Sequence, residues 1–219
     1  MRIPVLCFLL FLESLTLSGQ EKGKPSFIKG IYGNPGALLQ AGHSFQSLGV
    51  NAIFVRSVSL TADLYQTAKE NEVKVFVEFP LLNGKQYVEE HPEAWPLNEK
   101  GEKAPPADWF MGVCPTDTGF RNYRFEQLHT ILKQYDVDGI WLDYVHWHAQ
   151  FESAEPILPE TCFCQRCINS FGREMRIKVP EGAIALRSSW ILAEADSLWR
   201  VWRSNVLTRR VSEMKTVVK

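Results

Sequence analysis

Residues 73–79 read VKVFVEF, a run of β-branched and aromatic side chains without a turn-forming residue. Three other runs have the same character, namely residues 28–32 (IKGIY), 51–56 (NAIFVR) and 139–143 (GIWLD). Each ends in a polar or aromatic residue. Short apolar runs of this kind are typical of buried parallel strands, so the sequence predicts four of them.

Helical patterns lie between these runs, at residues 38–48, 61–70 and 120–135. Thr61 is placed to cap the second of them, because its hydroxyl can accept a hydrogen bond from a first-turn N–H group. The third has one apolar face, formed by Phe125, Leu128, Leu132 and Tyr135. The predicted order is therefore βαβαβαβ.

Two further helices are predicted after the last strand, at residues 165–175 and 187–219. The second should be one long helix with a continuous apolar stripe. The stripe consists of Ile191, Ala195, Leu198, Trp202, Leu207, Val211, Met214 and Val218.

Four βα units are half of what a TIM barrel contains, since a (β/α)8 barrel has eight strands and about 250 residues. We therefore interpret residues 20–219 as the N-terminal half of such a barrel, apparently truncated. A flavodoxin-like doubly wound sheet is the structural alternative. Gly30, Gly33 and Gly36 do not match the dinucleotide-binding fingerprint, so no organic cofactor is expected.

Residues 1–19 resemble a secretory signal peptide. Arg2 precedes an apolar core at residues 3–12, and small residues follow at 16–19. We expect a secreted or periplasmic protein. Glu13 interrupts the apolar run well short of the roughly 20 residues that span a bilayer, so no membrane anchor is expected.

The formal net charge of the chain is −1, from 24 basic and 25 acidic residues. A chain with this balance has no basic field that would attract nucleic acid, and nucleic acid is not expected as a partner. Oligomer formation stays open.

Residues 162–167 read CFCQRC and bring three thiols within six positions. Cys162, Cys164 and Cys167 can surround one tetrahedral ion, and Cys114 is the obvious fourth ligand. A site closed by four cysteines has no open position for water, so we expect structural zinc. The alternative is one disulfide from Cys114 to the cluster, with two spare thiols.

The predicted strands end in Tyr32, Arg56, Glu78 and Asp143, which parallel packing would bring to one rim. Asp143 and Glu78 are the candidate catalytic carboxylates for acid/base or nucleophilic chemistry. Two structural alternatives remain. Asp143 could cap the next loop or pair with Arg56, and Glu78 could belong to a buried ion pair.

Aromatic residues accompany this rim. Tyr144, His146 and Trp147 follow Asp143 directly. Trp109 lies in the loop at residues 80–118, and loops of this length in compact domains are usually functional. Flat rings with polar edges suit sugars, although such rings also pack loops together. The predicted substrate-binding residues are Tyr32, Arg56, Trp109, Tyr144, His146 and Trp147.

Residues 113–116 (VCPT), 135–144 (YDVDGIWLDY) and 162–167 (CFCQRC), together with Phe171, resemble secreted glycoside hydrolases with a TIM-barrel catalytic domain. The cysteine layout is similar to the structural zinc cluster of the family forty-two β-galactosidases. This similarity implies Cys114 and the three cysteines of 162–167 as zinc ligands.

Those β-galactosidases carry an Asn-Glu pair at the end of strand four, where this chain has Leu142, Asp143 and Tyr144. A strand-four aspartate resembles the nucleophile of α-galactosidase-like and fucosidase-like barrels. The resemblance thus implies a glycosidase acting on a carbohydrate, with a second carboxylate beyond residue 219. The alternative is a non-catalytic carbohydrate-binding or pseudoenzyme barrel.

Overall fold

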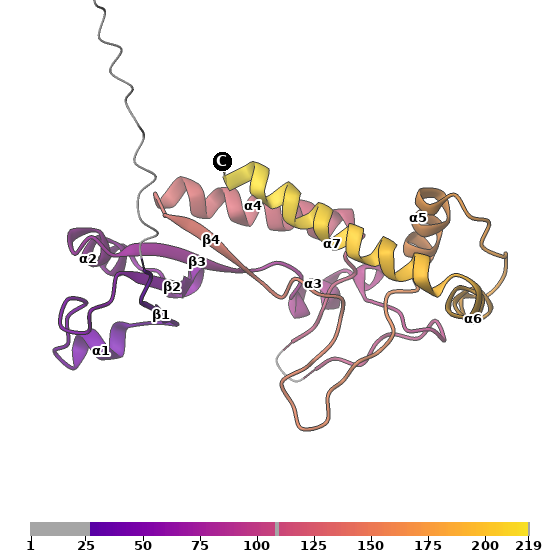
Figure 1. The fold of residues 1–219 in the computed structure, drawn as a ribbon, viewed down its shortest axis with the longest axis horizontal. Coiled ribbons are helices and arrows are strands. Elements are labelled where there is room, and N and C mark those ends of the chain that lie inside the picture. The colour runs from indigo at the N-terminus through magenta and orange to yellow at the C-terminus, as the bar shows by residue number, and fades with distance from the viewer. Residues whose placement is uncertain (1–26, 108–109, 219) are drawn as a thin grey trace, which may run out of the picture.

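The computed structural model describes residues 27–107 and 110–218, and its four strands form one parallel sheet (Figure 1). The strands are β1 Gly30–Tyr32, β2 Ala52–Arg56, β3 Lys74–Pro80 and β4 Gly139–Asp143. They lie side by side in chain order, which confirms the predicted arrangement of a partial TIM barrel. The predicted signal peptide at residues 1–19 lies outside the described residues.

Helices follow or connect the strands. They are α1 Gly36–Gln40, α2 Ala62–Glu70, α3 Lys85–Glu90, α4 Thr118–Gln134, α5 Gln165–Met175, α6 Ile184–Glu194 and α7 Asp196–Val218, with 3-10 turns η1 Ser57–Ser59 and η2 Pro92–Ala94. Among the described residues, none of the helices combines the length and apolarity that crossing a bilayer requires.

Side chains cap two of the helices that flank the sheet. The Thr61 hydroxyl accepts a hydrogen bond from the Leu64 N–H at 3.1 Å, as predicted for the start of α2. Asp117 does the same for the Phe120 N–H at the start of α4, at 2.8 Å. The first predicted helix is shorter than expected, since α1 ends at Gln40 and Gly42 follows with φ of +86°.

The two faces of the sheet differ in character. Val75 and Val77 are fully buried on the face covered by α2, where they pack near Leu64 and Ala68. The alternate positions face the other side. Phe54 stacks on Phe76 there with 4.8 Å between ring centroids, and the Trp141 ring lies 5.2 Å from Phe54. Helices therefore cover one face, as on the outside of a barrel.

A second apolar cluster holds the C-terminal helices together. Trp199 of α7 is fully buried between Phe163, Phe171 and Trp202, at centroid distances of 4.8 to 5.0 Å. From this cluster α7 runs back alongside α4 (Figure 1). Arg121 of α4 and Glu213 of α7 form an ion pair of 2.9 Å. The long helix thus joins the cysteine-bearing segment to the sheet.

The predicted single helix at residues 187–219 is wrong in one respect, because it is divided at Ala195 into α6 and α7. The apolar stripe nevertheless continues across the break, since Ile191, Ala195, Trp202 and Met214 are all buried. Leu198, predicted to face inward, is 40% exposed, and Trp199 is buried in its place. Sequence analysis also missed α3 and η2, which lie within the long loop at residues 80–118.

His148 fastens the loop after β4 to the loop before α4. Its Nδ1 accepts a hydrogen bond from the Gly112 N–H at 3.0 Å, and its Nε2–H donates to the Pro105 carbonyl at 2.7 Å. A Cβ atom at Gly112 would lie 2.8 Å from the His148 Cα, so only glycine fits there. Burial lowers the pKa of His148, which keeps this ring neutral.

We predict that Trp199→Ala lowers the free energy of unfolding by about 3–5 kcal/mol, because it removes a fully buried indole ring from the second cluster. Leu198→Ala, one position earlier on the same helix, is the control and should cost less than about 1 kcal/mol. Urea unfolding of both variants measures the difference. A larger loss for Leu198→Ala would contradict the helix phase described above.

A pH prediction follows from His148. Its pKa is lowered in the folded protein, so the unfolded state binds more protons once the pH falls below about 6.5. The free energy of unfolding should therefore decrease as the pH is lowered through that value and stay level above it. His148→Gln should weaken this decrease. Urea unfolding between pH 5 and 8 tests it, and an unchanged slope in the variant would contradict it.

Candidate site at the strand ends and a buried thiol cluster

Four polar side chains meet at the carboxyl ends of the strands. The Tyr32 hydroxyl donates a hydrogen bond to Asp143 Oδ2 at 3.3 Å, across 111 positions of sequence. Arg56 Nε donates to Glu78 Oε1 at 3.3 Å, as the register that pairs these two residues requires. The structure thus brings together the four strand-end residues that the sequence singled out.

Asp143 is held by its own neighbour in sequence. Its Oδ1 accepts a hydrogen bond from the Tyr144 N–H at 2.8 Å, while its Oδ2 faces Tyr32. Tyr144 adopts a left-handed backbone with φ of +51°. For a bulky aromatic residue this conformation costs on the order of 1–3 kcal/mol, and such strain is concentrated at functional sites. The aspartate therefore has a fixed orientation at the rim.

Glu78 is 2% exposed, whereas the side chain of its partner Arg56 is 61% exposed. The ion pair expected as the structural alternative for Glu78 is present. Partial burial and the negative charges of Glu78 and Asp143 raise the pKa of Tyr32 well above its ordinary value. Tyr32 is therefore a neutral hydrogen-bond donor between two carboxylates.

A cleft of about 770 Å³ opens at this rim. Arg56, Glu78 and Tyr144 line one end, and the cleft continues along α4 past Tyr123 and Arg124. Its size falls within the range of ordinary ligand sites. Sequence analysis did not identify these two α4 residues, because helix periodicity alone does not show which strand-end loops a helix will face.

The other predicted binding residues lie elsewhere. His146 donates from Nδ1 to the Trp147 carbonyl at 2.8 Å, and its ring faces Phe110 at 5.2 Å. It lines a separate cleft of about 380 Å³ between the loop after β4 and α7. Trp109 lies outside the described residues.

The placement of Trp147 at the strand-end rim needs correction. Its ring is 7% exposed and packs 5.9 Å from the ring of Trp202. The Arg203 guanidinium lies over the Trp147 ring, 4.9 Å from its centroid. Hydrophobic burial against α7 places this residue in the second cluster, away from the strand-end rim.

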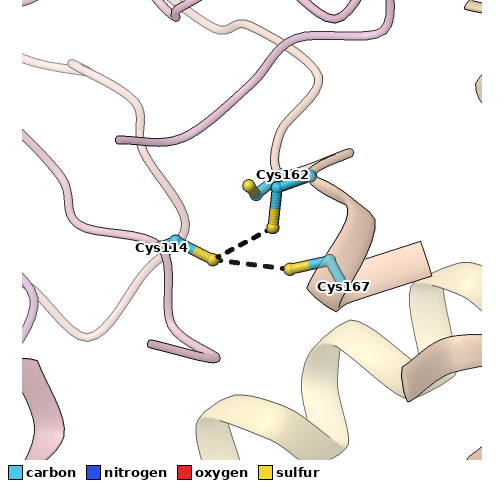
Figure 2. A group of neighbouring side chains, drawn as sticks. Cys114, Cys162 and Cys167 are labelled. Carbon is cyan, nitrogen blue, oxygen red and sulfur yellow. Dashed lines mark hydrogen bonds between the residues drawn. The ribbon is translucent and has the colours of Figure 1, made fainter. Parts of the chain in front are cut away.

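The four cysteines converge as the spacing indicated. Their sulfur atoms all lie within 4.8 Å of one another, and all four residues are buried without a disulfide. Cys114 Sγ is 3.7 Å from Cys164 Sγ and 3.5 Å from Cys167 Sγ. Figure 2 shows Cys114, from the loop before α4, facing Cys162, which precedes α5, and Cys167 in the first turn of that helix.

The surroundings of the sulfurs suit thiolates. The Leu97 N–H donates to Cys162 Sγ at 3.3 Å, and the Thr116 hydroxyl lies 3.3 and 3.2 Å from the sulfurs of Cys114 and Cys167. Arg166 donates to the Thr116 oxygen at 3.2 Å and adds a positive charge.

Burial and mutual hydrogen bonds shift the pKa values of the four thiols, and these shifts bear on how a cation would bind. Burial raises the pKa of Cys162 and Cys167, whereas hydrogen bonds with the neighbouring thiols, that of Cys162 first, lower the pKa of Cys114. A bound cation would displace the protons of the thiols and stabilise the thiolates. The four buried sulfurs can therefore hold a metal ion, and the set leaves no position for a fifth protein ligand or a catalytic water.

Neither a known family model nor a curated protein sequence matches the chain. Solved structures do resemble it in fold. A β-galactosidase from Bacillus circulans sp. alkalophilus has a TM-score of 0.57 at 13% identity, and covers 87% of this chain and 34% of its own.

Two further β-galactosidases show the same likeness. A catalytic mutant of Gan42B, a GH42 enzyme from G. stearothermophilus, has a TM-score of 0.57 at 12% identity, with 87% of this chain and 34% of that chain covered. The enzyme from Rahnella sp. R3 has a TM-score of 0.54 at 14% identity, with 85% and 33% covered. The chain thus spans about a third of these structures and shares the fold of TIM-barrel glycoside hydrolases.

Proposed function

We propose that this chain belongs to a secreted TIM-barrel protein that hydrolyses the glycosidic bonds of a carbohydrate. The observation that carries the proposal is the meeting of Asp143, Glu78 and Tyr32 at the carboxyl ends of the strands, where barrel enzymes hold their catalytic groups. The fold shared with β-galactosidases supports the same class of reaction. The activity is proposed for the barrel as a whole.

Asp143 is the proposed catalytic carboxylate. Its orientation is fixed from both sides, by the Tyr144 N–H and the Tyr32 hydroxyl, so little reorganisation is needed when a sugar binds. Glu78, paired with Arg56, is the second candidate carboxylate. A glycosidase needs two such groups on opposite sides of the scissile bond.

Tyr32 and Arg56 are proposed to bind the sugar. The Tyr32 hydroxyl donates hydrogen bonds at neutral pH, because its pKa is raised. Arg56 is exposed beyond its pair with Glu78 and can donate to ring hydroxyls. Tyr144 lines the cleft along α4 together with Arg56 and offers an aromatic face.

We further propose that the thiol cluster binds zinc with a structural role. Four cysteines with no carboxylate or histidine favour zinc among the common ions. The cluster lies at the start of α5, and Arg166 of that helix forms a 3.0 Å ion pair with Asp117, the cap of α4. A metal ion there would hold the third and fourth βα loops together.

Export of the protein, to the periplasm or outside the cell, is proposed from residues 1–19. The same location favours a carbohydrate substrate over nucleic acid, in line with the net charge of −1.

Asp143→Asn is expected to abolish turnover of aryl glycosides, because an amide of the same shape is neither a base nor a nucleophile. Folding should be nearly unchanged, since the amide oxygen still accepts the Tyr144 hydrogen bond.

Asp138→Asn is the matched control, at the opposite end of β4, where Asp138 accepts a hydrogen bond from the Val75 N–H at 2.9 Å. It should retain turnover. Full activity of Asp143→Asn would leave Asp143 as a structural anchor and favour a non-catalytic carbohydrate-binding protein.

For the metal, we expect one zinc ion per chain in elemental analysis of reduced protein. Cys114→Ser should lower the zinc content and the thermal midpoint together, because binding energy at such sites is folding energy. His146→Ala removes a potential ligand outside the cluster and should leave the zinc content unchanged. Zinc lost in His146→Ala but kept in Cys114→Ser would refute the four-thiol site.

A further inference from the structure

We propose that the cleft along α4 binds an anionic carbohydrate and that Arg124 recognises the carboxylate or sulfate group of this ligand. The inference rests on the proposed function and names the chemical class of its substrate. It starts from a cation that the described part of the chain leaves without a counter-ion.

The Arg124 guanidinium lies among aromatic rings rather than carboxylates. Its central carbon is 5.0 Å from the ring centroid of Phe120, 5.5 Å from Phe79 and 5.9 Å from Tyr123. It donates hydrogen bonds from Nη1 to Gln127 Oε1 at 2.6 Å and from Nη2 to the Asn83 carbonyl.

The hydrogen-bonding capacity of this guanidinium is only partly used, and no described carboxylate lies within ion-pair distance. An arginine has five N–H donors, of which the contacts above use two. The Nε donor is buried without a partner in the described structure, so the donors left for a ligand in the cleft are one N–H on Nη1 and one on Nη2.

Other largely buried arginines of the chain are compensated differently. Arg203 pairs with Glu160 at 3.4 Å, and Arg210 pairs with Glu213 at 3.0 Å. Arg187 also lacks a carboxylate, but two amide oxygens accept from it, those of Gln165 and Asn169, and it lines neither of the two large clefts. Arg124 therefore combines an uncompensated charge with an open cleft.

Keeping an unpaired charge partly buried is unfavourable, because solvation is lost and no partner replaces it. Burial accordingly lowers the pKa of Arg124 to about 10, which leaves the group charged at neutral pH. A bound anion would offset this cost with charge-assisted hydrogen bonds, and a planar carboxylate or a sulfate matches the guanidinium fork.

The position of Arg124 connects it with the candidate catalytic residues. The same cleft of about 770 Å³ contains Arg56 and Glu78 at the strand ends and Arg124 on α4. Tyr123 is 41% exposed there and offers a ring face for a sugar. The acidic groups of the cleft are Glu78, which is paired with Arg56, and the exposed Glu126. A carbohydrate that occupies the rim can thus place an acidic group beside Arg124.

The test is calorimetric titration of the full chain with trigalacturonate, with galactotriose as its neutral counterpart, and with sodium sulfate. We expect trigalacturonate to bind at least tenfold more tightly than galactotriose. Arg124→Met, which keeps the contact with the aromatic rings but removes the charge, should weaken trigalacturonate binding by about tenfold or more and leave galactotriose binding unchanged. Lys133→Met, an exposed cation on the same helix, is the control and should change neither.

If circular dichroism shows that Arg124→Met folds poorly, Arg124→Lys serves as a second variant. It keeps the charge but not the planar fork of donors, so it should lose only part of the trigalacturonate affinity. Equal binding of the charged and neutral sugars would overturn this inference and leave the proposed glycosidase intact. Unchanged trigalacturonate affinity in Arg124→Met would also overturn it, as would sulfate binding as tight as that of trigalacturonate. Failure of the proposed function would show separately, as full turnover by Asp143→Asn.

Discussion

Parallel pairing of neighbouring strands is the constraint on which the rest of this structure depends. Because β1 to β4 run in one direction and in chain order, every strand ends at the same edge of the sheet. The register then places Arg56 beside Glu78. The Tyr32 hydroxyl at the end of β1 reaches Asp143 at the end of β4, the outer strand on the other side of the sheet. The candidate site is thus a consequence of strand direction, and its residues need not be close in sequence.

The thiol cluster solves a different problem, because the loops after β3 and β4 are long and contain little secondary structure of their own. Cys114 lies in the first of these loops and Cys162, Cys164 and Cys167 follow the second, so one metal ion would tie both. Hydrogen bonds of His148 and the buried rings around Trp199 act on the same loops and on α7. These contacts and a bound metal ion would thus stabilise the same two loops.

The sequence predicted those features that depend on local pattern. The four strands, the Thr61 cap and the convergence of the cysteines follow from apolar runs, a capping residue and thiol spacing, and the structure has all of them. Features that depend on packing between distant segments were not predictable in this way. The break at Ala195 and the burial of Trp199 in place of Leu198 are of this kind.

The same limit applies to the site. Tyr32, Arg56, Glu78 and Asp143 could be identified because strand ends share an edge, whereas Trp147 was placed at the rim although α7 buries it. Arg124 carried no sequence signal at all, since an arginine within an amphipathic helix is usually a solvated surface residue. Its significance comes from the rings around it and from the cleft that it lines.

In the proposed function, the strand-end rim binds the sugar on which the barrel acts. A crystal structure of the Asp143→Asn variant with a bound oligosaccharide tests this most directly. The account predicts sugar hydroxyls within hydrogen-bond distance of residue 143, Tyr32 and Arg56, with the rest of the ligand in the cleft along α4. A sugar bound instead in the cleft between the loop after β4 and α7, with the rim empty, would contradict it.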